Sequence, residues 1–215
     1  MRVVLDAGHG GYDSGAVSNG LKEKDLTLKI VKLIRDKLVK NYIVDVYLTR
    51  EKDEYISLTN RSTFANVCNA DLTVSVHINA GGGTGYETFI HPNVKNNSEM
   101  KELQKLFHRQ NILRDRGMKT NNFSILRLTN MSAILTENGF IDNQNDMAIV
   151  TKKLNEIADF HVKAIVDFLK LKKKSNKKLV YYIESGGFID HKTCESMLKL
   201  FIDKGYYAVI KERYE

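Results

Sequence analysis

The feature that most constrains the fold is an alternation of short strand-like runs with amphipathic helical stretches. Residues 3–5, 44–48 and 72–76 have the length and composition of strands, and the last of them is continuous enough to be central in a sheet. Between them, residues 25–40 and 58–68 repeat apolar side chains at helical spacing. Strands that alternate with helices build a parallel sheet. We therefore expect an α/β domain, with a mostly parallel twisted sheet and helices on both faces.

The same pattern continues to residue 169. Residues 86–90, 124–128 and 133–136 are predicted strands, and residues 98–113 and 152–169 are predicted helices. The segment KLKKKSNKK at residues 170–178 then interrupts it with six lysines and no acidic residue. Three parts are therefore predicted: a domain at residues 1–169, a lysine-rich linker at 170–178, and a small unit at 179–215.

The small unit has its own pattern of strand, helix and strand. Residues 179–183 and 206–210 are the predicted strands, and the helix between them carries Cys194, Met197 and Phe201 on one face. A βαβ unit of this size without disulfides or metal rarely buries enough surface to fold alone. It should therefore dock on the first domain or, as we favour, pair with a second copy in a homodimer.

Charge and composition exclude several classes of protein. Most of the net charge of +7 lies in the lysine-rich linker, so no broad basic face for nucleic acid is expected. The linker is either solvated or attracted to an anionic polymer. No apolar run approaches the roughly 20 residues of a membrane span, and the first residues lack a signal-peptide pattern. Cys68 and Cys194 are interpreted as buried thiols, so any metal ligands must be histidine and carboxylate.

Polar side chains follow three of the predicted strands at the point where each strand ends. His9 lies in a glycine-rich turn after the first strand, His77 follows residues 74–76, and Glu137 follows residues 134–136. The carboxyl ends of parallel strands form the functional edge of an open α/β sheet. Each residue alone is more often structural, but Glu23, just before the helix at residue 25, adds a fourth group that could reach the same edge.

His9, Glu23 and His77 together are a ligand set for catalytic zinc. Two imidazoles and one carboxylate leave an open position for water, whose pKa the metal lowers to about 7. Glu137 is then free to act as general base and acid. The sequence therefore predicts a Zn²⁺ site with Glu137 as the catalytic residue.

Four segments carry a resemblance to a known family. LDAGHGG at residues 5–11, KEKDL at 22–26, SVHINA at 75–80 and LTENGFI at 135–141 resemble motifs of the zinc-dependent N-acetylmuramoyl-L-alanine amidases. Arg50, Leu58, Arg61 and residues 65–66 also match, whereas Ser132 replaces a common proline. The resemblance covers about residues 1–170, and it implies that the chain hydrolyses the amide bond between N-acetylmuramic acid and L-alanine in bacterial peptidoglycan.

Other residues have less specific predictions. Arg116 and Arg127 are candidates to bind carboxylates of the stem peptide, and Asn79 is a third candidate for substrate binding. His91, His108 and His161 are assigned to structure or surface. Residues 179–215 resemble one half of a SPOR domain, a peptidoglycan-binding module, which implies wall binding, dimerisation or both.

Two other functions remain open. One is a zinc peptidase or deacetylase that cuts another cell-wall bond, and the other is a catalytically silent wall-binding protein. The favoured interpretation is a phage endolysin or bacterial lysis amidase. Such an enzyme would be made in the cytoplasm without a signal peptide and would reach the wall after release at host lysis.

Overall fold

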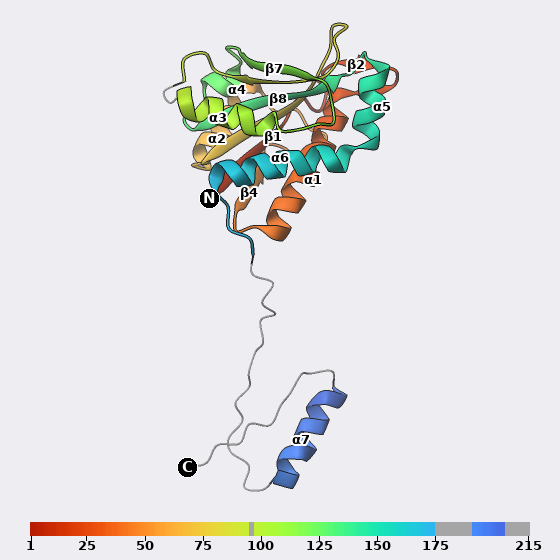
Figure 1. The fold of residues 1–215 in the computed structure, drawn as a ribbon, viewed down its shortest axis with the longest axis vertical. Helices are drawn as coiled ribbons and strands as arrows, with labels where there is room; N and C mark the ends of the chain where they lie inside the picture. The colour runs from red at the N-terminus through yellow and green to blue at the C-terminus, as the bar shows by residue number, and fades with distance from the viewer. Residues whose placement is uncertain (95–96, 175–190, 205–215) are drawn as a thin grey trace. The chain divides into compact units, whose positions relative to one another are not determined.

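The computed structural model describes residues 1–94, 97–174 and 191–204 (Figure 1). The chain divides into two compact units, residues 1–175 and 176–215. In the second unit, the described structure is helix α7 (His191–Asp203), which lies where the sequence predicts a helix. The two predicted strands at 179–183 and 206–210 lie outside the described residues.

The first unit is built on a six-stranded sheet of order β4-β1-β5-β8-β6-β7. Strands β4, β1, β5 and β8 are parallel, while β6 runs antiparallel to β8 and parallel to β7. A separate hairpin pairs β2 with β3. The bounds are β1 (Arg2–Ala7), β2 (Val17–Ser18), β3 (Leu21–Lys22), β4 (Asp45–Leu48), β5 (Leu72–Asn79), β6 (Tyr86–Ile90), β7 (Asp115–Thr120) and β8 (Ser132–Phe140).

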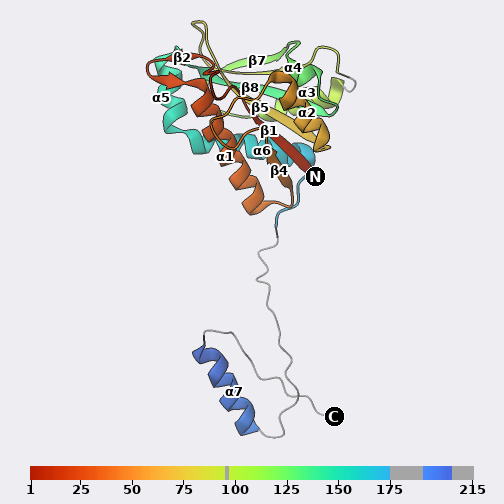
Figure 2. The ribbon, with the colours of Figure 1, turned by 180° about the vertical axis from the view of Figure 1, so that it is seen from behind.

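Helices cover both faces of the sheet, so the predicted α/β class is confirmed. Figure 1 is seen from the side of α3 and α6, and Figure 2 from the side of α2. Strand β1 shows why both faces need cover: Val3 and Leu5 pack in the larger core with α1 and α6, while Val4 packs with Ala65 of α2. The helices are α1 (Glu23–Asn41), α2 (Leu58–Val67), α3 (Asn97–Phe107), α4 (Ser124–Arg127), α5 (Gln144–Lys152) and α6 (Leu154–Leu169).

Several predicted elements need correction. Residues 124–128 are not a strand, because Ser124–Arg127 form the short helix α4, where the Leu128 amide donates to the Ser124 carbonyl. Ile125 and Leu126 are both buried in one cluster, which suits a helical turn better than an alternating strand. The helix predicted at 98–113 ends at Phe107, and β7 and α5 were not predicted. Cys68 is half-buried rather than buried, and the side chain of Cys194 lies outside the described residues.

The end of the first unit is anchored beside the beginning of β4. The Ile43 amide donates to the Lys172 carbonyl, and the Lys174 amide donates to the Asn41 carbonyl. The Asp45 amide donates to the Met1 carbonyl, so the N-terminus lies at the same end of the sheet. Residues 172–174, which the sequence assigns to a linker, are thus bound to the first unit.

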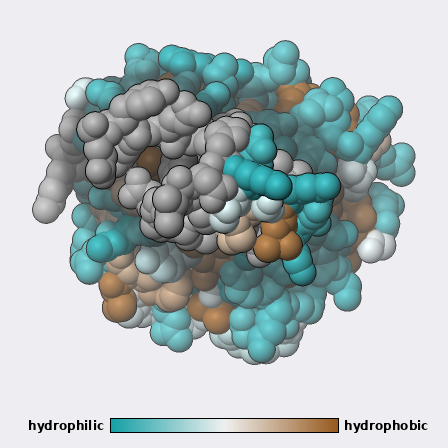
Figure 3. All heavy atoms as spheres, turned by 90° about the horizontal axis from the view of Figure 1, so that it is seen from below, coloured by the Kyte–Doolittle hydropathy of each residue, from teal (hydrophilic) through white to brown (hydrophobic). Residues whose placement is uncertain are grey.

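No helix in the described ranges is long and apolar enough to cross a membrane. The face drawn in Figure 3 is mostly hydrophilic, with hydrophobic side chains scattered among polar ones.

Candidate active site

His9, Glu23 and His77 meet at the rim formed by the carboxyl ends of the parallel strands. His9 follows β1, Glu23 is the first residue of α1, and His77 lies within β5. One ligand atom from each lies within 4.8 Å of the others. His9 Nε2 lies 3.2 Å from Glu23 Oε2, and His77 Nδ1 lies 2.9 Å from Glu23 Oε1. The structure therefore brings the three predicted ligands together.

The Glu23 carboxylate is held in place by backbone as well as by the two imidazoles. The Ala16 amide donates to Oε2 and the Ile78 amide donates to Oε1, each at 3.0 Å. Glu23 is buried, and burial alone would raise its pKa, but the hydrogen bonds from His77 and His9 hold the pKa well below its usual range. The sequence placed Glu23 in a loop before the helix. Its actual place in the first turn of α1 adds the favourable helix dipole.

The carboxylate also draws positive charge onto the imidazoles. Burial would lower the pKa of His77, yet the hydrogen bond and charge of Glu23 raise it to about 9. The pKa of His9 is raised for the same reason, against the effect of burial. A group of donors that favours positive charge at its centre fits a bound cation, which would replace the protons on the imidazoles.

Asp13 orients the first histidine. Its Oδ2 lies 2.9 Å from His9 Nδ1, and its Oδ1 accepts from the Gly15 amide. With Nδ1 engaged, Nε2 is the His9 atom that faces Glu23. A carboxylate behind a histidine is the usual outer partner of a metal ligand. Sequence reasoning missed Asp13, although its position four residues after His9 in a glycine-rich turn could have indicated this contact.

Two buried arginines hold the His9 loop. Arg61 donates to the carbonyl of His9 and to Asp6, and Arg50 donates to the carbonyl of Gly8. Asp6 is buried in β1, and although burial would raise its pKa, the charge of Arg61 and the hydrogen bond from Ser75 lower it. The sequence singled out both arginines only through the family resemblance. An acidic residue in an otherwise apolar strand, such as Asp6, was the available signal of a buried partner.

Glu137 lies inside β8, directly opposite His77 on β5 and Glu87 on β6. The sequence predicted that His77 and Glu137 follow their strands, but both strands extend past these residues. Burial raises the pKa of Glu137 to about 8; Glu23 and Glu87 act in the same direction and His77 acts against them. Its Oε2 is buried without a hydrogen-bond partner among the described residues. Such an atom next to a ligand group is available to a substrate or a water molecule.

Glu87 forms hydrogen bonds with two of the predicted substrate-binding residues. Its Oε1 accepts from Asn79 Nδ2 and its Oε2 accepts from Arg116 Nε, each at 2.7 Å, and Lys119 binds the same Oε2. Burial would raise the pKa of Glu87, but Lys119 and Arg116 lower it. The Arg116 guanidinium also lies over the ring of Phe140. Sequence reasoning missed Glu87, whose position in a short apolar strand resembles that of Asp6.

Arg127 is placed differently from Arg116. It is exposed at the end of α4, and its recorded hydrogen bonds go to Asn122 and Ser124. Of the histidines assigned to structure or surface, His161 is fully buried, His108 bonds to Thr88 and Asp115, and His91 bonds to Asn122.

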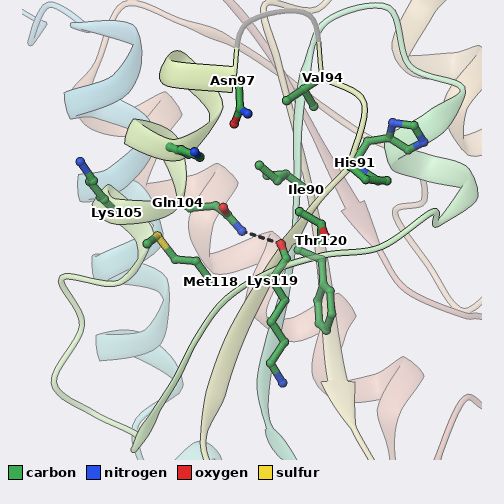
Figure 4. A pocket seen from close by; sticks show the side chains of 12 residues that line it. Ile90, His91, Val94, Asn97, Gln104, Lys105, Met118, Lys119 and Thr120 are labelled. Carbon is green, nitrogen blue, oxygen red and sulfur yellow. Dashed lines mark hydrogen bonds between the residues drawn. The ribbon is translucent and has the colours of Figure 1, made fainter.

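A hollow with a volume of about 630 Å³ lies between α3 and strands β6 and β7 (Figure 4). Gln104 Nε2 donates across it to the Lys119 carbonyl at 2.9 Å, and Ile90 and Met118 contribute apolar surface. None of the three predicted metal ligands lines it.

A family model described as N-acetylmuramoyl-L-alanine amidase matches residues 3–167. The chain belongs to this amidase family. It is 46% identical over 183 residues to an endolysin of Bacillus phage SPP1, covering 80% of this chain and 68% of the relative. It is 37% identical over 217 residues to the N-acetylmuramoyl-L-alanine amidase CwlM of Bacillus licheniformis, covering 98% of this chain and 84% of the relative.

Solved structures of the amidase family agree with the fold. The N-acetylmuramoyl-L-alanine amidase of Clostridium difficile 630 superposes with a TM-score of 0.74 at 35% identity, covering 79% of this chain and 96% of that one. The catalytic domain of CwlV from Bacillus (Paenibacillus) polymyxa gives 0.71 at 31% identity, covering 80% and 99%. The predicted family and its class of activity, a peptidoglycan amidase, are therefore confirmed.

Proposed function

We propose that the chain is a zinc-dependent amidase that cuts between N-acetylmuramic acid and L-alanine, with His9, Glu23 and His77 as the metal ligands. The observation that carries this proposal is the convergence of these three groups within 4.8 Å, next to a glutamate on the adjoining strand. Two imidazoles and one carboxylate are a known ligand set of catalytic zinc. The contact between Asp13 and His9 supports the same assignment.

When bound, Zn²⁺ supplies a Lewis acid that polarises the lactyl carbonyl and lowers the pKa of a water molecule. Glu137 accepts the proton of the attacking water and returns it to the departing amine of L-alanine. A raised pKa suits this exchange, because a carboxyl that titrates near neutral pH can both take up and release a proton. Oε2 of Glu137, which has no hydrogen-bond partner among the described residues, is the atom that we propose to carry the proton.

The Glu87 cluster supports a role in holding the stem peptide. Arg116 uses Nε to bind Glu87, and about one third of its side chain is exposed. Its terminal amino groups would bind a carboxylate of the substrate. Asn79 would hold the peptide backbone from the same cluster. For Arg127, only its closeness in sequence to β8 supports substrate binding.

The second unit and the lysine-rich segment belong to the same proposal. We propose that residues 179–215 act as a SPOR-like half domain that binds the wall, dimerises or does both, and that lysines of 170–178 attract anionic wall polymers. The similarity to a phage endolysin supports release onto the wall at host lysis.

Product analysis tests the reaction. Purified peptidoglycan incubated with the zinc-loaded chain should yield peptides that begin with L-alanine and glycan whose N-acetylmuramic acid carries a free lactyl carboxylate, both measured by mass spectrometry. New termini at other peptide bonds would instead indicate a peptidase, and loss of acetyl groups a deacetylase. If the chain binds zinc but releases no product from peptidoglycan, the result would favour a catalytically silent wall-binding protein.

A further inference from the structure

Two stacked tyrosines lie in the loops that follow β1 and β4, and the reaction proposed above does not use them. The rings of Tyr12 and Tyr55 are 4.2 Å apart at 25° to each other. Tyr12 is 82% exposed, the highest value among the large hydrophobic side chains of the described residues, and Tyr55 is 41% exposed. One face of the Tyr12 ring is thus covered by Tyr55 while the rest is open to solvent. Large exposed aromatic surface is a common mark of a binding site.

The loop that carries Tyr12 is fixed on both sides. The amides of Gly10 and Asp13 each bond to the carbonyl of the other residue. The Gly11 amide donates to Asp53 Oδ1, and Lys24 Nζ bonds to both the Gly11 carbonyl and Asp53 Oδ2. A Cβ on Gly11 would lie 2.6 Å from the Tyr55 backbone nitrogen, so the two loops are in direct contact. The pair is therefore preorganised, and binding would cost little side-chain or loop entropy.

The position of the tyrosine pair in the strand order indicates which part of a substrate it could contact. Tyr12 is three residues after His9 and directly before Asp13, which bonds to His9. Tyr12 follows β1, as His9 does, and Tyr55 follows the edge strand β4, which lies beyond β1 from the β5 strand of His77. The cluster of Glu87 and Arg116 belongs to β6 and β7, on the other side of β5. A substrate cut at the metal ligands would thus place its two halves over different ends of the sheet.

We infer that Tyr12 and Tyr55 form a stacking platform for a sugar ring of the glycan strand, while the stem peptide lies toward β6 and β7. This inference rests on the proposed amidase reaction. The C–H face of a pyranose ring is apolar and matches the exposed face of an aromatic ring. The peptide half carries carboxylates, which match Arg116 rather than a pair of phenols.

Competition by glycan strands freed of their peptides tests the platform. Such strands should inhibit the full chain when it cleaves a disaccharide-peptide substrate. In Tyr12→Ala and Tyr55→Ala the inhibition constant should rise about tenfold, as expected for the loss of one aromatic contact. Tyr12→Phe keeps the ring and should stay within about twofold of wild type. Because the assay measures competition for cleavage at the active site, its inhibition constant does not depend on wall binding by the second unit.

Tyr47→Ala is the matched control, because Tyr47 is also exposed but lies within β4. Bound zinc and melting temperature are measured for every variant, and the two alanine variants should match wild type in both. An unchanged inhibition constant in Tyr12→Ala, or no inhibition of wild type, would overturn the platform. Loss of zinc or of the fold in Tyr12→Ala, with Tyr55→Ala unaffected in all measurements, would also overturn it. Absence of L-alanine termini with wild type would instead refute the proposed reaction.

Discussion

At the scale of single residues, Glu137 differs from the other acidic groups of the rim. Glu23 and Glu87 each accept several hydrogen bonds, whereas Glu137 has an oxygen with none among the described residues. A carboxyl whose charged form accepts few hydrogen bonds in a desolvated position can take up a proton near neutral pH. This difference separates the proposed base from the proposed ligand and from the residue that positions Arg116.

Glu137→Gln should therefore lose activity but not metal. The amide keeps the shape of the side chain but cannot accept and return a proton. We expect kcat to fall by about 100-fold or more, because positioned general bases contribute about 10² to 10⁴ in rate. Zinc content, measured by atomic emission after dialysis, should stay near one per chain. Near-normal turnover would remove Glu137 from the mechanism.

His77→Ala should have the opposite pattern, with loss of the metal as the primary defect. Its imidazole is one of three proposed ligands and contacts Glu23 at 2.9 Å. The variant should bind far less than one zinc per chain, and adding a chelator should not lower its melting temperature further. Wild type should lose stability with chelator, because a ligand that binds only the folded state stabilises it. Retained stoichiometric zinc in the variant would contradict the ligand assignment.

His161 should make the fold sensitive to acid. It is fully buried, with Nδ1 donating to the Ile157 carbonyl and Nε2 next to Thr136 Oγ1, and burial lowers its pKa to about 4. The unfolded chain binds a proton at this residue below a pH of about 6.5. Its contribution to stability is thus complete above pH 6.5 and decreases as the pH falls toward 4, by on the order of 3 kcal/mol.

Denaturant unfolding of the full chain between pH 7 and 4 measures this loss. His161→Gln has no titrating group at this position, so its free energy of unfolding should fall less steeply over that range. Parallel curves for the two proteins would show that His161 does not carry the dependence.

At the scale of elements, the sequence predicted which residues come together at the candidate site better than it predicted the lengths and number of the strands around them. The strands that carry His9, His77 and Glu137 are apolar runs, and the rule that parallel strands end at one edge placed these residues together. The sequence could not show that β5 and β8 extend beyond His77 and Glu137, because that length depends on the pairing of β5 with β8 and of β8 with β6. Strand β7 was missed because an exposed edge strand of polar residues has no hydrophobic pattern.

The turn after β1 depends on glycine for space as well as for conformation. Gly15 has φ +62°, and a Cβ there would lie 2.6 Å from both His9 Cδ2 and Glu23 Oε2. Gly15→Ala should displace one of these ligands and weaken zinc affinity at least tenfold, measured by competition with a chelating dye. Gly20→Ala is the matched control: its φ is +76°, but no atom of the described residues lies within 4 Å of the added Cβ. Equal zinc affinity in the two variants would contradict the steric role of Gly15.

At the scale of the whole molecule, the α/β fold was predictable because alternation of strands and helices permits few topologies. The boundary at residue 170 was less accurate, since residues 172–174 are bound beside β4. Composition alone could not show this, because backbone groups make most of these contacts, together with Lys174 Nζ, which donates to the Val39 carbonyl.

The second unit is predicted to make the chain a homodimer. About 40 residues without metal or disulfide bury too little surface to fold alone, so a second copy should complete the unit. Sedimentation velocity at micromolar concentration should show a dimer for the full chain and a monomer for residues 1–174. A monomeric full chain would favour docking on the first unit instead.

The anchoring of residues 172–174 beside the start of β4 has a consequence for how the enzyme could be rebuilt. Because parallel strands begin at one end of the sheet and finish at the other, residues 172–174 lie at the end of the sheet opposite the candidate active site. A foreign targeting module spliced after Lys174 would therefore be joined at the end of the sheet away from the proposed metal ligands, which makes this junction suitable for chimaeric lysins directed at other cell envelopes.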